Sequence, residues 1–186
     1  MRTSIAKLIS DEPLRRRIIN SMKDGRLFIY PTDTVYGLGC NAENESAVKK
    51  IREIKGTEHP FSVIAPSKTW IKEKLMVPER SYLDKLPGAY TLIFKKREES
   101  YLPAASAGSI GVRIPDHPVS GLVRDAGVPF ITTSANLTGQ PTISRVEDIP
   151  ESMLEKIDFV IGGGELKGKP SQVIDLTGKK PIMIRR

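Results

Sequence analysis

The segment from Leu27 to Asn41, LFIYPTDTVYGLGCN, constrains the fold of this chain more than any other. It opens with the apolar run 27–30, which is typical of a buried strand, and Pro31 ends that run. A loop rich in hydroxyl groups follows, and it carries the glycines Gly37 and Gly39. Ligands bind at the rigid strand ends of open α/β sheets, so this loop is a candidate ligand-binding loop. The alternative is an ordinary turn that happens to carry polar side chains. Spacing alone favours neither.

Composition narrows the class of protein. A length of 186 residues predicts a single domain over residues 1–186, large enough for its own core. Hydrophobic residues make up 39% and charged residues 27%, and no apolar run is of membrane-spanning length, so we expect no membrane partner. The lone cysteine, Cys40, excludes an internal disulfide and favours a cytoplasmic location. A formal charge of +7 favours anionic partners such as nucleotides or RNA.

Periodicity and capping residues predict helices at 11–23, 44–55, 67–75, 78–86, 118–126 and 151–156. Apolar or alternating runs predict strands at 27–30, 61–65, 90–94, 110–114, 129–133, 159–161, 172–176 and 182–184. Helices and strands alternate, which predicts an α/β fold. Several strand pairs have connections too short for a helical crossover, so we expect a mixed sheet with flanking helices.

Polar side chains at the ends of predicted elements suggest a site. They are the Thr32 loop, Lys55 at the end of a helix beside Gly56, and the run 134–136 after a strand. Hydroxyls, an ammonium and an amide together suit a nucleotide or another phosphate. The sequence nevertheless has neither a Walker loop nor a convincing dinucleotide fingerprint. We expect Lys55 to be exposed, because it lies at a helix end.

Other reactive residues have simpler interpretations. Arg113 lies on a predicted interior strand and therefore needs an anionic partner, from the protein or from a ligand. Cys40 is expected to be a packed thiol rather than a nucleophile. His117, before Pro118, is expected to fix the start of a helix rather than to act as an acid or base. The histidines and Cys40 lie far apart in sequence, so we expect no metal site built by the protein.

Several separated motifs resemble the YrdC-like family, the threonylcarbamoyl-AMP synthases. They are PTDTVYGLG, SIGVRIPDHP, TSANLTGQPT, and the pattern PG-x-x-T at Pro87, Gly88 and Thr91. The resemblance covers nearly the whole chain, with the motifs in the family's order. It implies a twisted open mixed sheet with flanking helices around a concave, basic cavity, in the short single-domain form of the family.

The resemblance also implies an activity. Members of the family join L-threonine, bicarbonate or CO2, and ATP, with Mg²⁺ on the phosphates. They release pyrophosphate and threonylcarbamoyl-AMP, so the chain is expected to be a nucleotidyltransferase, an L-threonylcarbamoyladenylate synthase. A tRNA threonylcarbamoyl-transfer complex then passes the threonylcarbamoyl group to an adenosine of certain tRNAs.

Residue roles follow from the same resemblance. L-Threonine would be held by Thr32, Arg113, Thr132 and Ser171, with Arg113 on the carboxylate. Lys55 would meet the phosphates, and Lys55 and Arg113 are the expected catalytic residues. The nucleotide would contact Lys55, His59, Ser109, Ser134, Asn136, Thr142 and Arg185.

The chain departs from the family's pattern at Thr57, where members usually carry the arginine of Lys-x-Arg. We expect His59 or a lysine elsewhere to substitute, or ATP to bind more weakly. One alternative is a non-catalytic module that binds double-stranded RNA, tRNA or the ribosome through the basic cavity. Only 6% of residues are aromatic, which argues against a stacking platform for single-stranded RNA. Another alternative is a carbamoyl-adenylate-forming relative, as in the much larger hydrogenase-maturation proteins.

Overall fold

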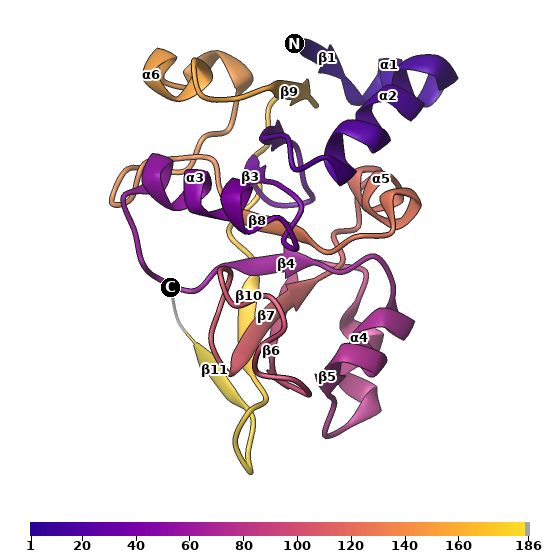
Figure 1. The fold of residues 1–186 in the computed structure, drawn as a ribbon, viewed down its shortest axis with the longest axis vertical. Helices are drawn as coiled ribbons and strands as arrows, with labels where there is room; N and C mark the ends of the chain where they lie inside the picture. Colours follow the sequence, from indigo (N-terminus) through magenta and orange to yellow (C-terminus); the bar gives the residue numbers. More distant parts are fainter. Residues whose placement is uncertain (185–186) are drawn as a thin grey trace.

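A mixed β-sheet runs through the computed structural model, which describes residues 1–184 (Figure 1). Strands neighbour one another in the order β1-β9-β2-β3-β8-β4-β7-β6-β10-β11, and β5 pairs with β6. Their bounds are β1 Arg2–Ser4, β2 Phe28–Tyr30, β3 Gly37–Gly39, β4 Ser62–Ile64, β5 Leu75–Met76, β6 Tyr90–Lys96, β7 Ser109–Arg113, β8 Phe130–Ser134, β9 Phe159–Gly162, β10 Gln172–Asp175 and β11 Ile182–Ile184. Parallel pairs such as β4–β7 adjoin antiparallel pairs such as β6–β7, which confirms the expected mixed sheet.

Helices cover both faces of this sheet. They are α1 Ile5–Ser10, α2 Glu12–Lys23, α3 Glu45–Lys55, α4 Lys68–Lys74, α5 Val119–Ala126 and α6 Glu151–Leu154, with 3₁₀-helices η1 Arg80–Lys85 and η2 Val146–Asp148. In Figure 1, α1, α2 and α5 gather on one side of the upper sheet, and α3 lies on the other side. The mixed α/β architecture with flanking helices is therefore confirmed.

Local capping explains where the predicted helices begin and end. The Asp11 side chain accepts from the N–H of Leu14 and caps α2. At α3, Asn44 caps the first turn, and Gly56 ends the helix in the left-handed region at φ +59°. These helix bounds agree with the sequence prediction to within a residue or two.

Alternation along the strands gives the two faces of the sheet different characters. One face buries Leu38, Val63, Val112 and Ile131 in a core that includes the apolar residues of α3. The opposite face is apolar where residues of α2 and α5 cover it, with Phe28, Tyr30, Ile64 and Phe130 in a second cluster. Farther along this second face, the strands present polar residues and glycine: Ser62, Thr91, Gly111, Arg113, Thr132 and Ser134. This polar part of the sheet supports the candidate site.

Two predicted segments differ from the structure. Residues 37–39 were expected in a loop but form β3, between β2 and β8. A Cβ at Gly39 would lie 1.9 Å from the carbonyl oxygen of Ile131, so glycine is what allows β8 to come this close. The helix expected at 78–86 is a 3₁₀-helix, η1. The short elements β1, α1 and β5 were not predicted at all.

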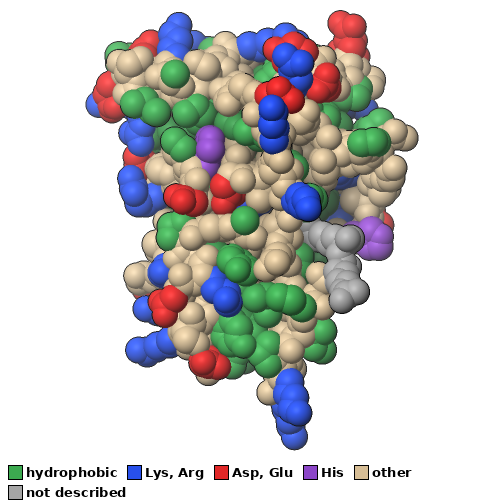
Figure 2. Space-filling model, turned by 180° about the vertical axis from the view of Figure 1, so that it is seen from behind, with side chains coloured by type: hydrophobic (Ala, Val, Ile, Leu, Met, Phe, Trp, Pro, Cys, Tyr) green, Lys and Arg blue, Asp and Glu red, His purple; other side chains and the backbone are tan. Residues whose placement is uncertain are grey.

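Figure 2 shows hydrophobic side chains gathered in the lower half of the back face. The exposed large hydrophobic residues include Ile182, Met183 and Ile184 of the edge strand β11. No helix in residues 1–184 has the length and apolar character needed to cross a membrane.

Candidate functional site

A cavity of about 270 Å³ lies against the polar part of the sheet. Its walls come from the loop after β2, from the strands β4, β6, β7 and β8, and from the segment before β10. Hydroxyl groups supply most of its polar lining: Thr32, Thr34, Tyr36, Ser62, Thr91, Thr132, Thr133, Ser134, Thr142 and Ser171. Segments from across the whole sequence therefore converge on one small polar chamber.

Gly111 underlies two side chains that form the floor of this chamber. A Cβ at this position would lie 2.5 Å from the hydroxyl oxygen of Ser62 and 3.1 Å from the Cγ2 of Thr91. Both neighbours line the cavity, so any side chain at 111 would take up space between them. The absence of a side chain at 111 thus makes room for the Ser62 and Thr91 side chains, which line the cavity.

Arg113, at the end of β7, is the charged residue of the lining. Its guanidinium is ion-paired with the carboxylate of Asp33, and its Nη1 donates to Thr34 Oγ1 at 3.2 Å. The other carboxylate oxygen of Asp33 accepts from the backbone N–H of Asp116 at 3.0 Å. Only 7% of the Arg113 side chain and 12% of the Asp33 side chain are exposed. The expected anionic partner is therefore Asp33.

A short relay of hydroxyls continues from this ion pair. Thr34 Oγ1 and Thr32 Oγ1 are 2.9 Å apart, and Thr32 Oγ1 donates to the carbonyl oxygen of Val35 at 2.8 Å. Because the proton of Thr32 is committed to Val35, the Thr34 hydroxyl is the donor between the two threonines. The loop after β2 is thereby fixed to Arg113 by hydrogen bonds as well as by charge.

The threonine-binding residues expected from the resemblance come together in this chamber. Thr32, Arg113, Thr132 and Ser171 all line it. Ser171, just before β10, lies 2.7 Å from Thr91 on β6 through their hydroxyl oxygens. This contact joins the C-terminal strand pair to the cavity wall.

Lys55 ends α3 beside Gly56, as predicted, but its side chain is not exposed. Its side chain was expected to be exposed, but the residue is only 6% accessible. Its amino group donates to the carbonyl oxygens of Ser134 and Asn136 and to Asn136 Oδ1. The turn that follows β8 covers the end of α3, which is the reason for the burial. Burial also lowers the pKa of Lys55 to about 8.

Of the remaining residues expected to bind the nucleotide, two line the cavity. Ser134 and Thr142 line it, whereas Asn136 belongs to the turn after β8 and is buried. His59 is exposed on the loop before β4. Ser109 lies at the opposite end of β7 from Arg113, about 13 Å along the strand at the usual rise per residue. Arg185 lies outside the residues that the structure describes.

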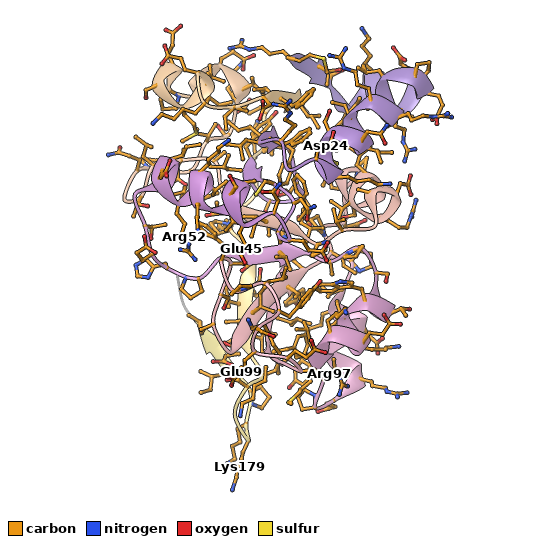
Figure 3. All side chains as sticks on the ribbon, in the orientation of Figure 1. Asp24, Glu45, Arg52, Arg97, Glu99 and Lys179 are labelled. Atoms are coloured by element: carbon orange, nitrogen blue, oxygen red, sulfur yellow. The ribbon has the colours of Figure 1, made fainter. Side chains whose placement is uncertain are left out.

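Sequence reasoning missed Asp33 and Arg52. Asp33 lies between the two threonines of the loop after β2, and the need of Arg113 for an anion was a signal that could have found it. Arg52 points from α3 toward the loop leading into β4 (Figure 3). Its guanidinium donates to the carbonyl oxygens of Thr57, His59, Ala104 and Ala105, and it lies 4.7 Å above the Phe61 ring centroid. Arg52 therefore holds the loop around Thr57 in place.

Two simple predictions are confirmed. His117 Nδ1 accepts from the backbone N–H of Val119 at 3.2 Å, so it fixes the start of α5, and burial lowers the pKa of His117. Cys40 is fully buried in the core, and burial raises the pKa of its thiol. An unreactive thiol is what this environment favours.

Charge in the cavity differs from the expectation. The resemblance implied a basic chamber, but of the described residues that line it Arg113 alone is charged, and Asp33 pairs with it. No group of three His, Cys, Asp or Glu residues suited to a metal ion occurs in the described part of the chain. The chamber is thus a hydroxyl-rich site for a small polar ligand, held at the ends of sheet strands.

These features define a ligand-binding α/β protein of the open-sheet class. The chain belongs to the Sua5/YciO/YrdC family, because residues 20–186 match the profile of that family, which is described as telomere recombination.

Relatives from different organisms agree with this membership. A putative threonylcarbamoyl-AMP synthase of Methanocaldococcus jannaschii is 37% identical over 187 residues, covering 94% of this chain and 88% of the relative. The crystal structure of Pyrococcus abyssi Sua5 with L-threonine superposes with a TM-score of 0.82 at 32% identity. It matches 91% of this chain, which spans only 53% of that longer protein. The crystal structure of Escherichia coli YciO gives a TM-score of 0.83 at 30% identity, over 95% of this chain and 90% of YciO.

Proposed function

We propose that this protein makes L-threonylcarbamoyl-AMP and pyrophosphate from L-threonine, bicarbonate or CO2, and ATP. The observation that carries the proposal is the convergence of Thr32, Arg113, Thr132 and Ser171 on one chamber. Similar proteins are named for this product, and the structure of one of them contains L-threonine. In reaction class the protein would be a nucleotidyltransferase.

Arg113 is the proposed partner of the threonine carboxylate. The contacts with Asp33 and Thr34 hold the guanidinium in one orientation at the wall of the chamber. Thr32 comes from the loop after β2, Thr132 from β8 and Ser171 from the segment before β10. Hydroxyls at these places suit the amino and hydroxyl groups of threonine, which need both donors and acceptors.

The nucleotide is proposed to lie toward Ser134, Asn136 and Thr142, with His59 and Ser109 as more distant contacts. Arg185, which lies outside the described residues, is proposed as a further contact. In the proposed reaction, the threonine amine attacks CO2, and the resulting carbamate oxygen attacks the α-phosphorus of ATP as pyrophosphate leaves. Negative charge builds on phosphate oxygens, so the protein contributes positioning and electrostatic stabilisation. No covalent nucleophile is required, in keeping with the inert Cys40.

Magnesium is proposed as the partner of the phosphates. The described lining offers hydroxyls rather than carboxylates, which does not suit a resident metal held by protein ligands alone. We therefore propose that Mg²⁺ arrives on the triphosphate of ATP, where it neutralises phosphate charge.

The product would serve tRNA modification in the cytoplasm. A threonylcarbamoyl-AMP is a mixed anhydride and needs an acceptor, which we propose to be an adenosine of tRNA, modified by a separate transfer complex. Direct contact of this protein with tRNA or double-stranded RNA is a further part of the proposal, and the net charge of +7 supports it.

Product identification tests the proposal. The purified protein is incubated with ATP, Mg²⁺, ¹³C-bicarbonate and L-threonine, and the mixture is analysed by mass spectrometry. We expect an adenylate whose mass contains both the threonine and the ¹³C carbon. Adenylates lacking the labelled carbon, or none at all, would exclude the proposed reaction. RNA retention without any adenylate would favour the RNA-binding alternative.

A further inference from the structure

All the N–H donors of the Lys55 amino group are used in hydrogen bonds within the protein. Its acceptors are the carbonyl oxygen of Ser134 at 2.9 Å, the carbonyl oxygen of Asn136, and Asn136 Oδ1 at 3.1 Å. An ammonium has three N–H donors, so these contacts use all of them. Thr138 also donates from its hydroxyl to the Lys55 carbonyl at 2.6 Å, which ties the same turn to the end of α3.

Asn136 links Lys55 to the cavity wall by hydrogen bonds. Its Nδ2 donates to the carbonyl oxygen of Gln140, which fixes the orientation of the amide. Its Oδ1 therefore faces Lys55, and it also accepts a hydrogen bond from the hydroxyl of Ser134. Lys55, Asn136 and Ser134 thus form a continuous hydrogen-bonded chain from the helix to the cavity wall.

Ser134 is the member of this chain that lines the cavity. Because its proton is given to Asn136, its oxygen meets the chamber as an acceptor. Its natural ligand groups are donors, such as a ribose hydroxyl or a water bound to a nucleotide's metal. A phosphate oxygen would not suit it while the chain of hydrogen bonds is intact.

We infer that Lys55 is a positioning residue, which sets the turn from Ser134 to Asn136 and so presents the Ser134 hydroxyl to the nucleotide without touching the nucleotide itself. This inference rests on the proposed function, because it assigns the nucleotide to the Ser134 wall. It differs from the sequence expectation, in which the ammonium contacts the phosphates directly.

The protonation state of Lys55 gives this arrangement a pH dependence. The groups facing the amine are neutral: the Ser134 carbonyl, and the carbonyl and side-chain amide of Asn136. Burial alone lowers its pKa, to about 8, and no charged side chain contributes to the shift. Below that pH the ammonium supplies all its donors, and above it the neutral amine leaves an acceptor unmatched.

A double-mutant cycle on ATP affinity tests the inference. Affinity is measured by calorimetry without threonine, at fixed magnesium and salt, for wild type, Lys55→Met, Ser134→Ala and the double variant. We expect Lys55→Met and Ser134→Ala each to weaken ATP binding about 10- to 100-fold. The double variant should bind ATP no more weakly than the single variant with the lower affinity. Lys50→Met, exposed on the same helix, is the matched control and should bind like wild type. Losses that multiply would show that Lys55 contacts ATP independently of Ser134.

A pH series supplies a readout that a merely structural role would not move. The ATP affinity of wild type should fall as the pH rises through about 8, whereas that of Ser134→Ala should not. An equal fall in both proteins would overturn the inference. If Lys55→Met fails to fold, Lys55→Gln takes its place, since an amide can still donate to the turn, and it should retain part of the affinity. Calorimetry requires no turnover, so this result is separate from threonine-dependent product formation.

Discussion

At the residue scale, Arg113 shows how far chemistry can be predicted from a strand pattern. A buried arginine must meet an anion, and that requirement was visible in the sequence. The position of Asp33 beside it depends on how the loop after β2 folds back onto β7, which no local pattern encodes. Lys55 shows the opposite outcome. Its exposure was judged from its place at a helix end, but a turn distant in sequence covers it.

Removing Arg113 should separate the two halves of the site. Arg113→Ala should raise the apparent KM for threonine far more than that for ATP, by an amount equivalent to about 2–5 kcal/mol. Arg113→Lys should rescue only part of the loss, because an ammonium keeps the charge but cannot form the bidentate contact of a guanidinium. Steady-state kinetics with each substrate varied in turn gives both values.

A control is needed because Arg113→Ala leaves the Asp33 carboxylate without its ion-pair partner. The double variant Asp33→Asn/Arg113→Ala removes that buried charge and should regain stability while its KM for threonine stays high. Equal effects of Arg113→Ala on the KM values of both substrates would show that Arg113 does not belong to the threonine half of the site.

At the element scale, helix ends and the longer strands were predictable from local sequence, whereas the shortest elements were not. Asp11, Asn44 and Gly56 mark helix ends by local hydrogen bonds and dihedral angles, so their positions are encoded within a few residues. The strand β3 was missed because its glycines resemble a loop, and only its neighbours Tyr30 and Ile131 explain them. Gly111 was correctly placed in a strand, but its close neighbours Ser62 and Thr91 come from other strands and were not predictable from the local sequence.

Gly111→Ala tests the role of the cavity floor. The added methyl should displace Ser62 and Thr91, so we expect weaker binding of threonine and ATP and a lower melting temperature. Gly121→Ala, within α5, is the control, because the nearest atom to a Cβ there would be the flexible Arg124 side chain at 3.8 Å. That change should raise the free energy of unfolding by about 0.5–1 kcal/mol. Unaltered ligand affinity in Gly111→Ala would show that the ligands do not use this floor.

At the scale of the whole molecule, the class of fold followed from the alternation of helices and strands, but the strand order did not. The order depends on pairings between distant segments, such as β4 with β8 and β6 with β10. The same pairings bring Thr132 and Ser171 to one chamber. Motif resemblance could name these residues, but their common location required the complete sheet.

The aromatic cluster that joins β2, β8 and β9 should contribute strongly to the free energy of unfolding. The ring centroids of Phe28 and Phe130 are 5.7 Å apart, and those of Phe28 and Phe159 are 4.8 Å apart. Phe130→Ala should therefore lower the free energy of unfolding by about 3–5 kcal/mol in urea titrations. Ile9→Ala, at a residue that is 69% exposed, should change it by no more than about 0.5 kcal/mol. A small effect at Phe130 would contradict its place in the core.

One chamber is proposed to join threonine, a one-carbon unit and ATP. The most direct test measures pyrophosphate release from ATP with all substrates present, and again with L-threonine or bicarbonate omitted from degassed buffer. We predict release in the complete mixture and background levels in each omission. Pyrophosphate released equally without threonine would contradict the proposed reaction and would indicate a plain ATP pyrophosphatase.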